Sequence, residues 1–284
     1  MLVTAKEMLQ KAYKGRYAVP AINTQGGTYD IIRAICLAAE ELQSPVILAH
    51  YMNTGAYSGH EWFAETAKWM AKQVSVPVAV HLDHGDCFDH CIQMLLFGFT
   101  SIMYDGSMLT LEENAAKTSQ VINACHAVDI PVEAEIGQLS RLTDQGEIMG
   151  KANVAKPELV KEYLNLCCPD SLAIGIGNAH GFYKGPVEIH VDVLENCRSF
   201  TDIPFVLHGC TGMDDALIER SIQAGVAKIN FGTQVRCQYI EHLKEGLKKG
   251  VDQGHAWRLS QYASDKLKED IKGIIRVAHS EGKS

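Results

Sequence analysis

The chain has 284 residues, 46% of them hydrophobic, and a formal net charge of −8. This acidic balance, without any block of like charges, argues against nucleic acid as the main partner and leaves room for a local phosphate site. No apolar stretch is long enough to span a bilayer, the N-terminal residues do not form a signal peptide, and nine scattered cysteines lack zinc-finger spacing. We therefore expect a cytoplasmic protein with reduced thiols and no membrane partner.

Short apolar runs alternate with longer stretches of helical spacing. Several of the runs begin at a proline, which a strand tolerates at its first residue because no ladder donor is needed there. In chain order, the predicted strands cover residues 17–22, 45–49, 77–81, 100–104, 131–135, 171–175, 204–207 and 227–230. Apolar positions three and four residues apart predict helices over residues 28–42, 62–70, 111–126 and 213–224.

Eight strands alternating with helices, without a break in composition, are typical of a (β/α)₈ barrel. We predict a single α/β domain, a TIM barrel, over residues 1–284. The alternative is an open doubly wound sheet, which is disfavoured because no dinucleotide glycine fingerprint follows a predicted strand. Residues around 256–280 predict an additional C-terminal helical segment that covers a barrel edge or a neighbouring subunit.

One connection is longer than a simple link between strand and helix. Residues 137–155 follow the fifth predicted strand, show little periodicity and contain three glycines and several polar residues. Connections of this length often serve as lids or binding loops. We predict a long mobile loop here; the alternative is a surface insertion without a function.

Three histidines lie at or just past the C-terminal ends of predicted strands. His84, His180 and His208 each follow an apolar run. In a barrel or an open parallel sheet, the C-terminal ends of the strands carry the chemistry. Three imidazoles that meet there form a site for a divalent metal with an open coordination position.

Acidic residues follow the same strands. Asp83 precedes His84, Asp105 ends the fourth strand and Glu135 ends the fifth. Carboxylates at the ends of successive strands are costly inside a barrel unless they are paired or bind a metal. Asp83 fits a general acid/base or a group that orients a metal ligand, although a single Asp–His pair is more often an ordinary hydrogen bond.

Two glycine-containing turns are suited to binding phosphate. One turn runs from His208 through Gly209 and Thr211, and the other runs from Asn230 to Thr233. Glycines let backbone amides approach an anion, a helix N-terminus adds partial positive charge, and barrels often bind phosphate at these two positions. The alternative is that the turns are merely tight and the threonines cap helices. Lys184, four residues past His180, either reaches the same anion or is a solvated surface lysine.

Taken together, these motifs resemble the class II, metal-dependent ketose-phosphate aldolases, the family of fructose- and tagatose-bisphosphate aldolases. The resemblance covers almost the whole chain. Its most specific parts are His81-Leu82-Asp83-His84-Gly85, Glu133-Ala134-Glu135-Ile136-Gly137, His180-Gly181 with Tyr183-Lys184, and His208-Gly209 with Gly212.

The resemblance implies a barrel that forms a homodimer or homotetramer and cleaves a ketose phosphate reversibly into dihydroxyacetone phosphate and an aldehyde. It implies that His84, His180 and His208 hold Zn²⁺, which stabilises an enediolate, and that Asp83 acts on the C4 hydroxyl. Asp105 and Glu135 would surround the metal. The phosphate would be held by Gly181, Lys184, Gly209, Thr211, Asn230 and Thr233. Some family members also bind a monovalent cation, Na⁺ or K⁺, beside this phosphate.

Several positions depart from the family pattern. The glutamate expected as the enolisation base falls on Thr143, so Asp144 or Glu147 is the candidate substitute. Tyr51 stands where a small hydroxyl residue is usual. In bisphosphate aldolases, an arginine near the C-terminus reaches the far phosphate in a neighbouring subunit; Arg258 is either that arginine shifted by one residue, or the contact is lost. Loss of that bidentate contact weakens the case for a bisphosphate substrate. We expect the far end of the sugar to differ from fructose or tagatose bisphosphate.

Two other functions are compatible with the same pattern. A zinc hydrolase or isomerase could use the same barrel, because the fold alone does not determine the reaction. A noncatalytic member that binds sugar phosphate or supports a companion subunit is the alternative from another class. The intact histidines and Asp83 argue against an inactive site, whereas the altered loop argues weakly for one.

Overall fold

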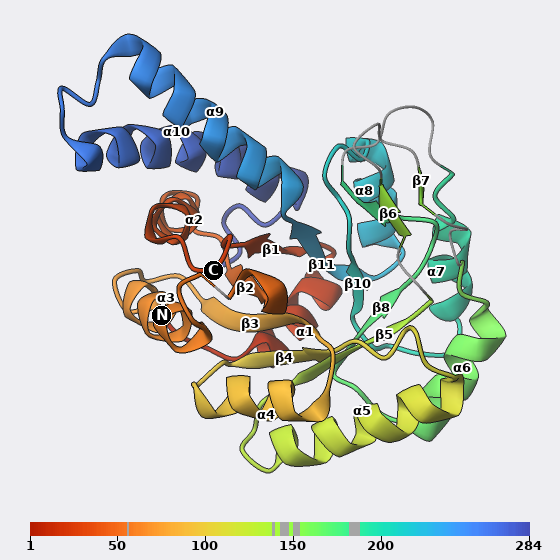
Figure 1. Ribbon diagram of the computed structural model, residues 1–284. Helices are drawn as coiled ribbons and strands as arrows, with labels where there is room; N and C mark the ends of the chain where they lie inside the picture. Colours follow the sequence, from red (N-terminus) through yellow and green to blue (C-terminus); the bar gives the residue numbers. More distant parts are fainter. Residues whose placement is uncertain (56, 138–139, 143–147, 150–153, 182–187) are drawn as a thin grey trace.

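The computed structural model describes residues 1–55, 57–137, 140–142, 148–149, 154–181 and 188–284. Within these residues, eight parallel strands close into a barrel in the order β1-β11-β10-β8-β5-β4-β3-β2, so that the predicted TIM-barrel fold is confirmed (Figure 1). The barrel strands are β1 (Val19–Asn23), β2 (Val46–Tyr51), β3 (Val78–Gly85), β4 (Ser101–Tyr104), β5 (Val132–Ile136), β8 (Ser171–Ile174), β10 (Phe205–Leu207) and β11 (Val226–Phe231).

Seven helices of the described chain surround the barrel, each in a connection between successive barrel strands (Figure 1). They are α2 (Tyr29–Glu41), α3 (His60–Ala71), α4 (Phe88–Leu96), α5 (Leu111–His126), α6 (Pro157–Leu166), α7 (Val191–Cys197) and α8 (Asp215–Gln223), and a short 3-10 helix, η1 (Met52–Thr54), precedes α3. Their apolar faces pack on the outer side of the strands, as Ile31 and Ile35 of α2 do. Burial of one such side chain stabilises the fold by about 1.5–3 kcal/mol.

The N-terminal helix contributes to a second, smaller hydrophobic cluster. Helix α1 (Ala5–Gly15) packs Met8 and Leu9 in a cluster with Val19, Ile47 and Ala227 of three barrel strands. These strand residues alternate with the residues that face the outer helices, so they point into the barrel. Because α1 precedes β1 and packs on inward-facing residues near the start of the strands, we infer that it closes the N-terminal end of the barrel.

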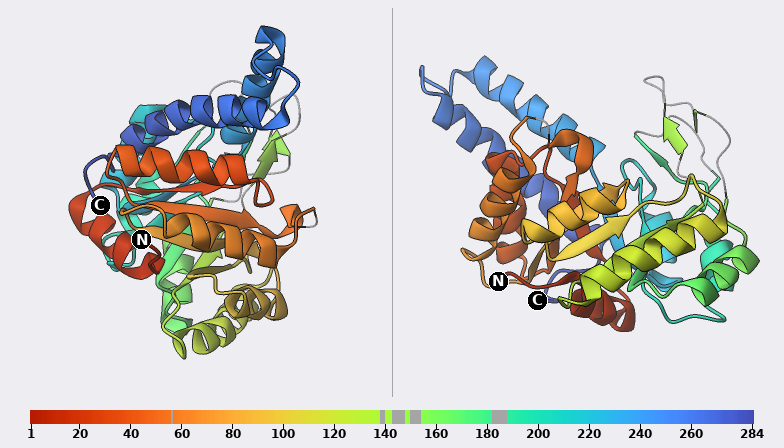
Figure 2. Two further views of the ribbon diagram at one scale, coloured as in Figure 1. Left: turned by 90° about the vertical axis from the view of Figure 1, so that its left-hand side faces the viewer. Right: turned by 60° about the horizontal axis from the view of Figure 1, so that its bottom comes forward.

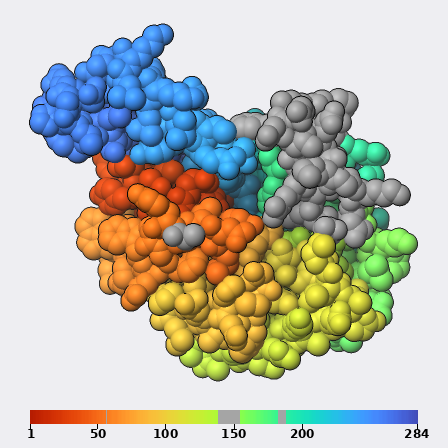
Figure 3. Space-filling model, viewed as in Figure 1, coloured from red at the N-terminus to blue at the C-terminus, as the bar shows by residue number. Residues whose placement is uncertain are grey.

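The last two helices form a hairpin that projects from the barrel. Helices α9 (Thr233–Lys249) and α10 (Ala256–Val277) pack against each other, and Figures 2 and 3 show them standing out from the rest of the molecule. Helix α10 also packs against α2, where Ser264 donates a hydrogen bond to the carbonyl oxygen of Asp30 at 2.8 Å. Within the described residues, no helix is both long and apolar enough to cross a membrane.

A small sheet lies beside the barrel mouth. The loop predicted over residues 137–155 contains β6 (Ser140–Leu142) and β7 (Ile148–Met149), and β6 pairs in parallel with β9 (Ala179–His180). Several residues of this loop lie outside the described part of the chain, and its mobility remains a prediction. The pairing connects the loop to the strand that carries His180.

Candidate active site

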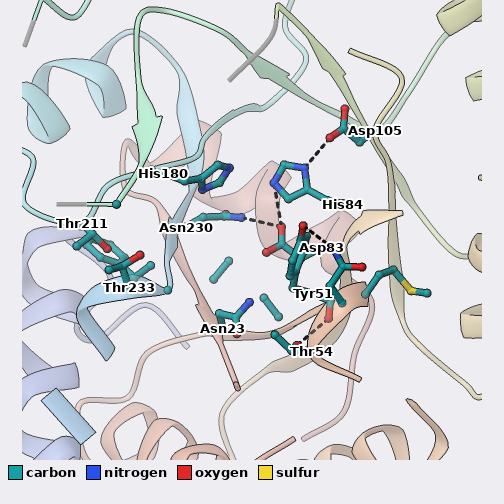
Figure 4. A pocket seen from close by; sticks show the side chains of 18 of the residues that line it. Asn23, Tyr51, Thr54, Asp83, His84, Asp105, His180, Thr211, Asn230 and Thr233 are labelled. Atoms are coloured by element: carbon teal, nitrogen blue, oxygen red, sulfur yellow. Dashed lines mark hydrogen bonds and ion pairs between the residues drawn. The ribbon is translucent and has the colours of Figure 1, made fainter. Parts of the chain in front are cut away.

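A cavity of about 580 Å³ opens at the C-terminal ends of the barrel strands. It is the position at which TIM barrels carry their sites. The predicted site residues that line it are Asp83, His84, Asp105, Glu135, His180, Gly181, Gly209, Thr211, Asn230 and Thr233. Figure 4 shows Asp83 and His84 between Asp105 on one side and Thr211 and Thr233 on the other.

The three predicted histidines converge although they lie far apart in the sequence. His84, His180 and His208 each direct one ring nitrogen toward a common point, and these atoms lie within 4.8 Å of one another. The ring centroid of His84 lies 5.2 Å from that of His180 and 4.9 Å from that of His208. The structure therefore brings together the three imidazoles that the sequence placed at separate strand ends.

The backbone of His84 explains how two consecutive side chains reach the same cavity. Alternation along β3 would send Asp83 and His84 to opposite faces of the sheet. However, His84 has a φ of 55°, and the pairing of β3 with β4 shifts register between Leu82 and Gly85. A left-handed conformation costs a residue other than glycine about 1–3 kcal/mol, and such strain concentrates at functional sites.

Carboxylates orient two of the imidazoles. Nδ1 of His84 lies 2.7 Å from Oδ2 of Asp105, and Nε2 of His208 lies 3.0 Å from Oε1 of Glu133. Of the opposite nitrogens, Nε2 of His84 has no hydrogen-bond partner among the described residues, and Nδ1 of His208 lies 3.2 Å from the Asn230 amide nitrogen. In metal sites, a carboxylate bonded to the far nitrogen commonly fixes the orientation of a ligand histidine in this way.

The second of these carboxylates belongs to a buried network that the sequence reasoning did not identify. Glu133 accepts a hydrogen bond from the Lys228 ammonium at 2.7 Å, and the same ammonium lies 3.0 Å from Nε2 of His81. Nδ1 of His81 lies 2.8 Å from the Ser101 hydroxyl. Lys228 is only 1% exposed and lies in the middle of a strand. A charged residue within an apolar run of the sequence could have indicated a buried ion pair at this position.

Electrostatic effects differ strongly between neighbouring groups. Although burial lowers the pKa of His84, the carboxylates of Asp83, Asp105 and Glu135 raise it to about 9. Burial holds the pKa of His208 well below its usual value, with a further contribution from His84. Burial and the Asp105 charge raise the pKa of Glu135 well above its ordinary value.

Two buried atoms indicate that the site fits a metal ion. Within the described residues, Nε2 of His84 and Oε2 of Glu135 are buried and have no hydrogen-bond partner. Buried polar atoms without partners are rare and costly in native proteins. The donor set of three imidazoles with adjacent carboxylates is that of a divalent transition metal, and zinc is the ion that most often takes three histidines with an open position.

The turns predicted to bind phosphate lie together at the start of a helix. Thr233 is the first residue of α9, and the Thr211 hydroxyl accepts a hydrogen bond from the Gln234 backbone amide at 3.3 Å. A side chain at Gly209, whose φ is +70°, would place its Cβ 2.3 Å from the carbonyl oxygen of Ala179. Only glycine fits there, which keeps this wall of the cavity open.

The remaining residues singled out from the sequence differ in whether the structure places them at the cavity. Lys184, Asp144 and Glu147 lie outside the described residues. Tyr51 lines the cavity, with its ring centroid 6.0 Å from that of His84. Arg258, near the start of α10, bonds to Gln253 and does not line the cavity of its own chain. Arg236 of α9, which the sequence reasoning did not select, does line it.

The chain is similar to known proteins over its full length. Residues 3–283 match the family model described as fructose-bisphosphate aldolase class-II. The YdjI aldolase of Escherichia coli K12 superposes with a TM-score of 0.88 at 29% identity, covering 100% of this chain and 99% of its own. Fructose-bisphosphate aldolase of Campylobacter jejuni superposes with a TM-score of 0.83 at 22% identity, covering 100% and 97%, and supports the fold alone.

The fold and the site together define a TIM-barrel protein with a histidine-rich centre at its mouth. The chain belongs to the class II fructose-bisphosphate aldolase family, and this membership implies a lyase of the aldolase kind. The resemblance inferred from the motifs is therefore confirmed at the level of the family.

Proposed function

We propose that this protein is a zinc-dependent aldolase that reversibly cleaves a ketose phosphate into dihydroxyacetone phosphate and an aldehyde. The observation that carries the proposal is the convergence of His84, His180 and His208, at a cavity that Asp83, His84 and His180 line. Family membership supports the reaction class. The substrate class is supported by the helix N-terminus and the two threonine-containing turns on the same cavity wall.

His84, His180 and His208 would hold the metal, and Asp105 would orient His84 for that role. When bound, a divalent metal there would draw electron density from the ketone and hydroxyl oxygens of the sugar and stabilise the negative charge that develops as the C3–C4 bond breaks. Glu133 keeps His208 in the required orientation. Glu135, whose pKa is raised by burial, adds a second carboxyl group beside His84, with Oε2 3.8 Å from Nδ1.

Asp83 is placed to move the proton of the C4 hydroxyl. Burial alone would raise the pKa of Asp83, but the charges of neighbouring groups, that of His84 first, outweigh that effect and lower it. The side chain is therefore a carboxylate that can accept the proton in cleavage and return it in condensation. The Asn230 amide lies 3.3 Å from Oδ1 of Asp83 and holds the carboxylate at the cavity wall.

The phosphate would bind where backbone amides and hydroxyls gather. Helix α9 has 17 residues and begins after Gly232, which offers no side-chain cap, so the partial positive charge of its N-terminus lies at the cavity wall. Its Gln234 amide bonds to the Thr211 hydroxyl. Thr211, Thr233 and Gly209 line the same wall. We propose that Gly181, Lys184 and Asn230 complete this subsite and that Na⁺ or K⁺ binds beside it.

The proposal also covers the enolisation base, the oligomeric state and the far end of the sugar. Asp144 or Glu147 would exchange the proton at the enediolate carbon. We propose a cytoplasmic homodimer or homotetramer, by analogy with the family. We also propose that the far end of the sugar differs from fructose or tagatose bisphosphate, because Arg258 is offset by one residue from the family pattern.

A retro-aldol screen tests the proposed function. The metal-loaded protein would be incubated with ketose phosphates of varied length and stereochemistry, and released triose phosphate would be measured by a coupled assay. We expect triose phosphate and an aldehyde in equal amounts from at least one substrate other than the two bisphosphates. Phosphate release or isomerisation without carbon–carbon cleavage would contradict the proposal, and binding without any turnover would favour the noncatalytic alternative.

A further inference from the structure

Most thiols in the described chain are buried, and burial keeps them protonated. Burial raises the pKa of six cysteines, namely Cys36, Cys91, Cys125, Cys167, Cys197 and Cys210. Cys87, Cys168 and Cys237 are not buried. Cys87 is the one among these three that shares a metal-sized cluster with other donor groups in the described residues.

The cluster lies in the turn between β3 and α4. One ligand atom each from Asp86, Cys87 and His90 can be chosen so that all three lie within 4.8 Å of one another. Nδ1 of His90 is 2.5 Å from Oδ1 of Asp86. Cys87 is the residue that precedes the first turn of α4, and its thiol makes no capping hydrogen bond to that helix.

The chemistry of these donors selects a class of ligand. A carboxylate, a thiolate and an imidazole form a mixed set that suits zinc and related divalent transition metals, whereas magnesium and calcium prefer oxygen ligands throughout. The N-terminus of α4 carries partial positive charge, which opposes a cation. Two anionic donors, Asp86 and Cys87, offset this opposition.

The alternative is that Asp86, in the turn before α4, and His90, on α4, form only an exposed ion pair four residues apart. Such a pair is worth a few tenths of a kcal/mol and would explain their contact. The Cys87 thiol also bonds to Asp86, and with His90 it completes a set of three different donor types within 4.8 Å of one another.

We propose that Asp86, Cys87 and His90 form a second site for a divalent transition metal, distinct from the three-imidazole centre. Binding replaces the thiol proton of Cys87, which is released to solvent, and leaves the remaining coordination positions to water. Because Asp86 also lines the catalytic cavity, an ion held here would fix part of the cavity rim. The inference depends on this cluster alone and not on the proposed reaction.

Cobalt substitution tests the proposal, because a thiolate bound to Co²⁺ gives a charge-transfer absorption in the near ultraviolet that an all-imidazole site does not. The full-length metal-free protein would be titrated with Co²⁺ alone. We expect two bound equivalents, one of them with the thiolate band. The buried Cys210 thiol near the cavity stays protonated, since burial raises its pKa to about 12, and donates to the Leu207 carbonyl oxygen.

Three variants identify the sulfur ligand. Cys87→Ser and His90→Ala should each lose the thiolate band and the second equivalent while keeping the first equivalent and the circular dichroism of the wild type. Cys168→Ser, which removes an exposed thiol elsewhere, should keep the band. Absence of the band in the wild type at saturating Co²⁺, its survival in Cys87→Ser, or its loss in Cys168→Ser would overturn the proposal.

Discussion

At the scale of single residues, the site depends on the unusual conformation of His84. Its left-handed backbone puts two adjacent side chains, a metal-ligand candidate and an acid/base candidate, into one cavity. Asp83 is 8% exposed and remains a carboxylate because nearby imidazoles lower its pKa against the effect of burial. The proposed mechanism therefore assigns metal binding and proton transfer to separate side chains.

Replacement of Asp83 by asparagine should separate these two roles. The variant keeps the three imidazoles, so we expect its metal content to equal that of the wild type. Turnover should fall by about 10²–10⁴-fold, the usual contribution of a positioned acid or base. Metal analysis and retro-aldol rates on the same samples provide the measurement.

Asp89→Asn is the matched control, because Asp89 is an exposed carboxylate on α4 outside the cavity. It should retain both metal and turnover. If Asp83→Asn retained full turnover, Asp83 would not be the proton carrier.

A buried histidine outside the site should govern acid stability. His50 is fully buried, stacks on Phe63, and has its pKa lowered by burial from 6.5 to about 3. Between these values the unfolded chain binds the proton and the folded chain does not, so stability is complete above about pH 6.5 and falls as the pH decreases. From pH 6.5 to 5, His50 alone should cost about 2 kcal/mol.

Urea unfolding at both pH values would measure this effect. His50→Phe should reduce the acid-induced loss of stability by about that amount, whereas replacement of the exposed His255 by phenylalanine should leave the loss unchanged. An equal loss in the wild type and in His50→Phe would show that His50 does not control it.

At the scale of elements, a buried ion pair joins two strands across the barrel interior. Lys228 of β11 and Glu133 of β5 are 1% and 2% exposed, and Glu133 also holds His208 of the β10 end. Removing one partner of a buried pair leaves an uncompensated charge, which costs about 3–5 kcal/mol. The network thus links the stability of the barrel to the orientation of one metal-ligand candidate.

Lys228→Met should lower the free energy of unfolding by about 3–5 kcal/mol. Combining it with Glu133→Gln should recover much of that loss, because no unpaired charge remains and the glutamine can still bond to His208. Urea denaturation of the two single variants and the double variant measures the coupling. Strictly additive losses would mean that the two side chains do not interact energetically.

The strands were predictable from sequence because each is a buried apolar run, and the longer amphipathic helices were predictable from their spacing. Helices α4, α6 and α7, which were not predicted, have 9, 10 and 7 residues and so offer few turns in which to see a period, although α8, with 9 residues, was predicted. Helix α9 has 17 residues, but it projects from the barrel and buries only Val235, Tyr239 and Gly246, so it lacks an apolar stripe. Its existence could not be read from periodicity.

At the scale of the whole molecule, barrel closure creates contacts that no local pattern encodes. The sequence placed His84, His180 and His208 at strand ends, and their convergence follows once eight strands form a closed ring. Lys228 was not predicted to matter, because its partners lie on β5 and β3 and only closure brings them to it. The order of strands was thus accessible from the sequence, whereas pairings across the barrel were not.

The account depends most directly on a metal at the three imidazoles being required for carbon–carbon cleavage. The measurement is triose phosphate release by the wild-type protein before chelation, after removal of all metal, and after Zn²⁺ is restored. We predict that cleavage is lost in the metal-free protein and returns with Zn²⁺, and that His208→Ala shows no such recovery. Undiminished cleavage by protein shown to contain no metal would contradict the account.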